Sequence, residues 1–154
     1  MNRRSTDSDS LSGLFNSLAG QWKFERIIEN QGQADGNAAF NMQSSGNLLY
    51  REEGIYQSQT EKQYRIFREY LYSCQNNQIS VYFVENNSAP RLFYTLMPVF
   101  IDHQCRYATG RHLCLKDTYE AKYTFICFNE FTLRYQVNGP AKNYFIETHY
   151  VRKP

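Results

Sequence analysis

From residue 21 onward, the sequence consists of short runs in which polar and apolar side chains alternate, separated by polar or glycine-containing turns. In "WKFERII" (22–28), Trp22, Phe24 and Arg26 share one face, because successive side chains of a strand point to opposite sides. Turn signals return about every 8 to 14 residues, which is typical of an all-β protein. No long helical segment lies between these runs, so βαβ units are excluded. The pattern predicts a closed antiparallel barrel of about 8–10 strands in one domain, residues 10–154.

Several segments carry specific expectations within this pattern. We expect "NQGQADGN" (30–37) to be a turn, and Gly54 to mark a bulge or bend in its strand. "MPVFIDHQC" (97–105) reads as irregular. Hairpin turns are expected around residues 115–117 and around residues 139–140.

The N-terminal part of the chain differs from the rest. Residues 1–9 are polar and are expected to form a disordered tail. Ser10 can then cap a helix of about two turns, which Gly20 ends. The apolar positions of this helix have helical spacing: Leu11, Leu14, Phe15 and Leu18. A helix so short needs a surface to pack on, and we expect it to cap one end of the barrel.

Composition excludes several classes of function. The net charge is +2 without a basic block, so nucleic-acid binding is not expected. No stretch approaches about 18 apolar residues, so a membrane partner is not expected either. The four cysteines form no CxxC pair, and "MNRRSTDSDS" does not resemble a signal peptide. We therefore expect a cytoplasmic protein with free thiols, either a monomer or a homodimer.

The sequence also resembles known families. Gly20-x-Trp22, with Arg152 late in the chain, is similar to the calycin (lipocalin-like) signature, in which a basic residue packs across the tryptophan. A closer resemblance, over residues 18–152, is to the domain-of-unknown-function family 6314. It rests on "GQWKFER", "YREEG", "REYLY", "HLCLKDTY" and "GPAKNYFIETHYVR", and Asn143 stands where that family usually has an acidic residue. The resemblance implies a calycin-like barrel and assigns no activity.

Strand parity predicts which side chains meet inside the barrel. Arg26, Arg68 and His112 are expected to point inward, and Glu53 is preferred over Glu52 as the inward acid because of the family match and Gly54. One interpretation is an internal ion pair between an arginine and Glu52 or Glu53. The other is that the arginines and His112 bind an acidic group of a ligand. The full candidate ligand site is Arg26, Tyr50, Glu53, Arg68, Tyr70, His112, Tyr119 and Tyr123.

The leading functional hypothesis is a barrel that binds one small amphipathic or aromatic molecule, with an anionic group as one option. The alternatives are an enzyme that uses His112 as a general acid or base, and a protein-interaction module that uses the tail, the N-terminal helix or the 97–109 segment.

Three further sites were weighed in the stretch "RHLCLKDTYEAKYTF" (111–125) and around the other histidines. A metal site would use His112, Cys114 and Asp117, although Asp117 lies about 10 Å further along an extended strand. Cys114 could be a nucleophile, but the simpler interpretation is a small core residue. A haem ligand would be His112, His103 or His149. We predict no cofactor and no metal.

Overall fold

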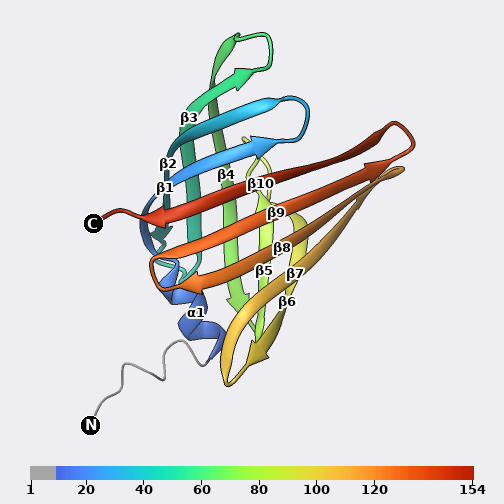
Figure 1. Cartoon of the computed structure of the whole chain (residues 1–154). Coiled ribbons are helices and arrows are strands. Elements are labelled where there is room, and N and C mark those ends of the chain that lie inside the picture. Colours follow the sequence, from blue (N-terminus) through green and yellow to red (C-terminus); the bar gives the residue numbers. More distant parts are fainter. Residues whose placement is uncertain (1–9) are drawn as a thin grey trace.

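The structure, a computed structural model, describes residues 10–154 and consists of one short helix followed by ten antiparallel strands (Figure 1). The expected disordered tail, residues 1–9, lies outside the described residues. The elements are α1 (Leu11–Ser17), β1 (Gly20–Ile28), β2 (Gly32–Met42), β3 (Leu48–Ser58), β4 (Gln63–Gln75), β5 (Gln78–Phe83), β6 (Arg91–Ile101), β7 (Gln104–Cys114), β8 (Asp117–Cys127), β9 (Glu130–Gly139) and β10 (Lys142–Arg152). In the part of the chain that the structure describes, no helix is long and apolar enough to cross a membrane.

The ten strands close into one barrel, as predicted. Each strand pairs with the next along the chain, and β1 pairs with β10 to complete the circle. At this seam Trp22 stands opposite Arg152, and Arg26 stands opposite Thr148. Closure gives both the first and the last strand a partner, which removes the exposed edges that an open sheet would have.

The predicted helix is also confirmed. The Ser10 hydroxyl accepts a hydrogen bond of 3.0 Å from the backbone N–H of Gly13, which is the capping interaction expected from the sequence. The helix buries Leu11, Leu14 and Phe15 against one end of the barrel (Figure 1). It ends at Ser17, and β1 begins at Gly20 with a φ of +129°.

Arg152 ties the end of the chain to its beginning. Its guanidinium lies 4.2 Å from the centroid of Trp22 and 4.1 Å from that of Phe128. It also donates hydrogen bonds to the backbone carbonyls of Ser17, Ala19 and Phe128. Trp22 in turn donates through Nε1 to the Leu18 carbonyl at 3.0 Å. The expected packing of Arg152 across the tryptophan is therefore confirmed, and the same side chain donates hydrogen bonds to the carbonyls of Ser17 and Ala19 at the end of α1.

Three local expectations were wrong. Residues 32–37 belong to β2 rather than to a turn, and residues 97–101 continue β6 to a tight turn at Asp102 and His103, which both have positive φ. Gly54 causes no bulge, since β3 stays in register with both neighbours. Gly54 instead faces Gly36 across the β2–β3 pair, and a Cβ at Gly54 would lie 2.2 Å from the Asp35 carbonyl oxygen. The glycine pair allows a close approach of the two backbones.

We expect Arg152→Ala to lower the free energy of unfolding by about 2 kcal/mol, because it removes the cation–π contacts and leaves carbonyls of α1 and the β8–β9 turn without a donor. Urea unfolding followed by Trp22 fluorescence measures this loss. Lys23→Ala, at an exposed position of β1, is the control and should change the free energy by less than about 0.5 kcal/mol. Equal effects of the two substitutions would contradict the structural role of Arg152.

Candidate functional site

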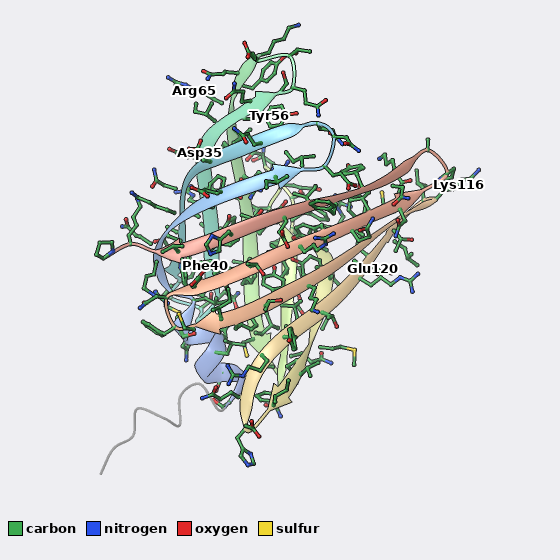
Figure 2. The ribbon with its side chains drawn as sticks, viewed as in Figure 1. Asp35, Phe40, Tyr56, Arg65, Lys116 and Glu120 are labelled. Atoms are coloured by element: carbon green, nitrogen blue, oxygen red, sulfur yellow. The ribbon has the colours of Figure 1, made fainter. Side chains whose placement is uncertain are left out.

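The barrel interior nearest α1 is apolar and tightly packed. Trp22 and Phe131 meet edge to face with centroids 4.9 Å apart, and Phe131 stacks on Tyr150 at 4.4 Å. Phe40 adds a further ring, 5.1 Å from Tyr72 (Figure 2). All of these side chains are buried, so this part of the lumen is a structural core.

An ion pair between Arg26 and Glu52 spans the middle of the barrel. Two guanidinium nitrogens of Arg26 donate to the two carboxylate oxygens of Glu52, each at 2.7 Å, and Nε donates to Thr148 Oγ1 at 2.8 Å. The Tyr50 hydroxyl donates to Glu52 at 2.6 Å and lies 2.8 Å from the Tyr150 hydroxyl. The internal ion pair that the sequence left as one interpretation is therefore present, with Arg26 and Glu52 as its members.

The preference for Glu53 as the inward acid was wrong. Glu52 is only 1% exposed, whereas Glu53 is exposed on the outer face of β3. The reason is the unbroken register of β3: Leu48, Tyr50 and Glu52 follow one another on the inner face without a bulge.

The environment keeps both members of the pair charged. Burial alone would raise the pKa of Glu52, but the hydrogen bonds and charge of Arg26, helped by Tyr50 and Arg68, outweigh burial and lower this pKa below its usual range. Burial also opposes the charge of Arg26, yet the hydrogen bonds to Glu52 and the negative charge of Glu52 raise the pKa of Arg26 above its ordinary value. The pair is therefore ionised at neutral pH.

Beside the ion pair, four tyrosine hydroxyls form a chain of hydrogen bonds. Tyr123 lies 2.7 Å from Tyr72 and 2.5 Å from Tyr94, and Tyr94 lies 2.8 Å from Tyr135, measured between hydroxyl oxygens. Burial raises the pKa of each of these hydroxyls, so they are neutral donors and acceptors. Within residues 10–154, no buried side-chain nitrogen or oxygen lacks a hydrogen-bonding partner. This middle layer satisfies itself and offers no unpaired polar group to a ligand.

At the end of the barrel opposite α1, an aromatic layer centres on Phe93. Phe83 stacks on Phe93 with centroids 4.3 Å apart, and His112 meets Phe93 edge-on at 5.1 Å. Tyr70 and Tyr119 lie 6.0 Å and 6.5 Å from the same ring. We call these five residues the mouth layer: Tyr70, Phe83, Phe93, His112 and Tyr119. Tyr70, Phe83, His112 and Tyr119 are half-buried, so the layer is partly open to solvent.

Arg68 lies next to this layer. It shares the inner face of β4 with Tyr70 and Tyr72, and it stands opposite Glu52 in the β3–β4 register. Its side chain is exposed and makes no ion pair or hydrogen bond with any of the described residues. Arg68, Arg26, Tyr50 and Tyr70 border a cavity of about 30 Å³, which has room for about one water molecule.

The predicted site residues thus fall into two groups. Arg26, Tyr50 and Tyr123 belong to the buried polar layer, where their polar atoms already have protein partners. Arg68, Tyr70, His112 and Tyr119 lie at the mouth. Whether either group binds a ligand stays a prediction.

The catalytic and metal alternatives find little geometric support. His112 has no hydrogen-bonding partner among residues 10–154, so no second side chain orients its ring. Cys114 is exposed, and Asp117 forms an ion pair of 3.0 Å with Lys142. Among the described residues, no group of His, Cys, Asp and Glu side chains could hold a metal ion.

The other candidate haem ligands lie outside the lumen. His103 is exposed in the β6–β7 turn. His149 lies on the outer face of β10, 2.5 Å from the Glu130 carboxylate.

Sequence reasoning missed Phe93, which contacts more of the mouth layer than any other ring. A β-bulge in the β5–β6 pair explains this, because Val81 pairs with Tyr94 and Tyr82 pairs with Leu92, which leaves Phe93 as the extra residue. Phe93 and Tyr94 consequently both point inward, although they are adjacent. Strict alternation places one of two adjacent residues outside, so only the apolar character of both could have indicated this arrangement.

The chain matches the model of a family of unknown function, DUF6314, over residues 18–152. No curated protein matches it significantly in sequence. Among solved structures, an S-type phycobiliprotein lyase from Guillardia theta is similar with a TM-score of 0.60 and 8% identity, covering 100% of this chain and 99% of the lyase.

Two engineered barrels match more loosely. A redesigned β-barrel has a TM-score of 0.48 and 10% identity, covering 90% of this chain and 94% of its own. A de novo designed fluorescence-activating barrel has a TM-score of 0.42 and 9% identity, with coverages of 90% and 96%.

We expect Arg26→Met to lower the free energy of unfolding by about 3–5 kcal/mol at neutral pH, because it leaves the buried Glu52 carboxylate without its cation. Adding Glu52→Gln should restore part of this loss. Arg51→Met, at an exposed ion pair on the outer face of β3, the strand that carries Glu52, is the control and should cost less than about 1 kcal/mol. Urea unfolding at pH 7 compares the four proteins.

The pH dependence has a definite sign. The pKa of Glu52 is lower in the folded than in the unfolded protein, so the pair stabilises the fold above about pH 4.3 and its contribution is lost as the pH falls through the folded pKa. The difference between the wild type and Arg26→Met should therefore shrink from pH 7 to pH 3. A difference that stays constant over this range would contradict the ionised pair.

Proposed function

This chain belongs to the family of unknown function DUF6314, whose name assigns no activity, and we propose from its geometry that the barrel binds a small aromatic or amphipathic molecule with an anionic group at the mouth layer. The observation that carries the proposal is the position of Arg68. It is an arginine on the inner face of the barrel, free of ion pairs within residues 10–154, beside a continuous set of half-buried aromatic rings.

The two parts of the mouth suit the two parts of such a ligand. The rings of Tyr70, Phe83 and Phe93 offer flat apolar surface for stacking, and Tyr119 adds a hydroxyl at the edge. Arg68 offers a planar fork of donors that matches a carboxylate, sulfonate or phosphate. Arg91 packs over Phe83, with its guanidinium carbon 4.6 Å from the ring centroid, but its charge is already paired with Glu85 at 2.9 Å, so the anionic group is assigned to Arg68.

The buried polar layer beneath the mouth favours the mouth, and not the deep lumen, as the binding region. The ion pair and the tyrosine chain each satisfy their polar groups through their own hydrogen bonds, and the cavity beside them holds only about 30 Å³. A drug-sized ligand needs about 300 Å³ or more. We therefore place the ligand on the outer side of the mouth layer, flanked by the β7–β8 and β9–β10 hairpins that project at this end (Figure 1).

The structural comparisons support this proposal at the level of the fold. The protein named as a phycobiliprotein lyase has a barrel that aligns over the whole length of this chain. A shared fold can host many functions, so the choice of ligand rests on the residues at the mouth.

The proposal predicts that a fluorescent aromatic anion, 8-anilinonaphthalene-1-sulfonate, binds the native protein at micromolar concentration and shows enhanced emission. Arg68→Gln should weaken this binding about ten-fold, because it removes one charge-assisted interaction. Arg65→Gln, on the opposite face of the same strand, should leave the affinity unchanged (Figure 2). Fluorescence titration measures all three affinities.

A second probe separates the anion from the aromatic body. N-phenyl-1-naphthylamine has the same ring system without the sulfonate, so its affinity should not respond to Arg68→Gln. Native mass spectrometry of the purified protein tests for a bound molecule from the cell. Probe binding that is equal in the wild type and Arg68→Gln would overturn the proposed site.

A further inference from the structure

The wall of the barrel is open along part of the β6–β7 pair. The two strands pair from Met97–Ile101 on β6 to Gln104–Thr109 on β7. Beyond that point residues 91–96 of β6 pair only with β5, and residues 110–114 of β7 pair only with β8, within the chain that the structure describes. Figure 1 shows the β7–β8 hairpin continuing away from the start of β6 at this end. Two facing strand edges therefore lack a neighbour, although the barrel is closed elsewhere.

Backbone groups of both strands face this gap. A Cβ built on Gly110 would lie 2.7 Å from the Tyr94 ring and 3.1 Å from the Thr95 carbonyl oxygen, so β6 and β7 are still in close contact at Gly110 and the gap opens only beyond it. The Thr95 carbonyl points from β6 toward β7. Successive residues of an antiparallel strand direct their N–H and C=O groups to opposite sides. Thr95 and Met97 are two positions apart, so Met97 also directs its N–H and C=O groups toward β7, where its partner is Thr109. The same alternation turns the N–H and C=O groups of Arg111 and Leu113 toward the open gap.

The gap opens into a groove of about 920 Å³, which is lined by residues from both faces of the sheet. Its floor includes Phe93, Tyr94 and His112 from the inner face. Its rim includes exposed apolar side chains, of which Met97 is 71% and Leu113 is 66% exposed.

The charged side chains at the rim are mostly basic. Arg111, Lys122 and Arg134 line the groove, against one acidic residue, Glu120, on the outer face of β8 (Figure 2). Arg134 already lies 3.6 Å from Glu147, whereas Arg111 and Lys122 form no ion pair with any residue from 10 to 154. The groove is therefore complementary to an acidic partner.

We propose that this gap binds an extended segment of another protein, which adds as a strand to the free edge of β7. Main-chain hydrogen bonds to Arg111 and Leu113 would hold the segment, as in other cases of strand addition. Because strand side chains alternate, its inward residues would be apolar and rest on Phe93 and His112, and its outward residues would be acidic and face Arg111 and Lys122. The partner is thus a segment that alternates acidic and apolar residues, and this interaction goes beyond small-molecule binding at the mouth.

The test uses a fluorescein-labelled acetyl-Glu-Val-Glu-Val-Glu-Val-amide peptide and the full-length protein. Fluorescence polarisation should show saturable binding, and the matched Lys-Val peptide should bind at least about ten-fold more weakly. A Glu-Val peptide with N-methylated glutamates should lose binding as well, because the outward-facing glutamates are the residues opposite Arg111 and Leu113 whose N–H groups point toward β7. Hydrogen exchange should slow at the amides of residues 110–114 when the Glu-Val peptide is present.

Substitutions locate the interaction. Arg111→Glu should weaken binding of the Glu-Val peptide about ten-fold, whereas Lys23→Glu, the same charge change on the exposed face of β1, should leave it unchanged. Thermal unfolding checks that both variants are folded. Equal binding of the Glu-Val and Lys-Val peptides, binding that survives N-methylation, or protection confined to other strands would each overturn the proposal. Arg68→Gln should not affect this peptide, so the outcome is independent of the ligand site at the mouth.

Discussion

The ion pair between Arg26 and Glu52 determines what the rest of this barrel can do. A charge inside a protein must be paired and hydrogen bonded, and here both conditions are met by residues from β1, β3 and β10. The pair lies next to the seam at which the first and last strands meet, so the chain must close for Thr148 and Tyr150 to reach it. Once closed, the polar layer separates a packed aromatic core near α1 from the half-open mouth. The middle of the barrel therefore leaves neither an unpaired buried polar group nor the space that a small-molecule ligand would need.

The sequence was a good guide to architecture because period-two alternation is a local signal. It predicted the all-β class, the closed barrel, the capping helix and the position of Arg152 over Trp22. It also placed Arg26 inside. Parity from Leu48 and Tyr50 pointed equally well to Glu52, and the preference for Glu53 rested on the family match and on an irregularity at Gly54 that the register of β3 does not contain. Gly54 allows a close approach to Gly36 on the neighbouring strand β2. That approach depends on the register of β2 against β3, which a single sequence does not reveal.

The mouth was harder to predict because it depends on a real bulge. The extra residue at Phe93 shifts the register of β6 against β5 by one position. As a result, two adjacent aromatic residues, Phe93 and Tyr94, both point inward. Nothing in "RLFYTL" distinguishes this from a regular strand with one ring exposed. Phe93 consequently escaped the list of candidate residues, although it joins Tyr70 on β4 to His112 on β7 and Tyr119 on β8. The β6–β7 pair contains a second bulge, because Val99 pairs with Tyr107 and Phe100 pairs with Cys105, which leaves Arg106 of β7 as the extra residue.

The bulge at Phe93 and the gap beside it also couple the two proposed sites. Phe93 and His112 belong to the mouth layer and to the floor of the β6–β7 groove, so they present one ring surface to both regions. A ligand stacked on the mouth side and a strand added at the gap would each fix the positions of these rings. If the two require the same ring positions, each strengthens the binding of the other, and if they require different positions, each weakens it by the same factor. Within residues 10–154 the His112 ring makes ring contacts with Phe83, Phe93 and Tyr119 and no hydrogen bond, so either partner would act on its position through these rings.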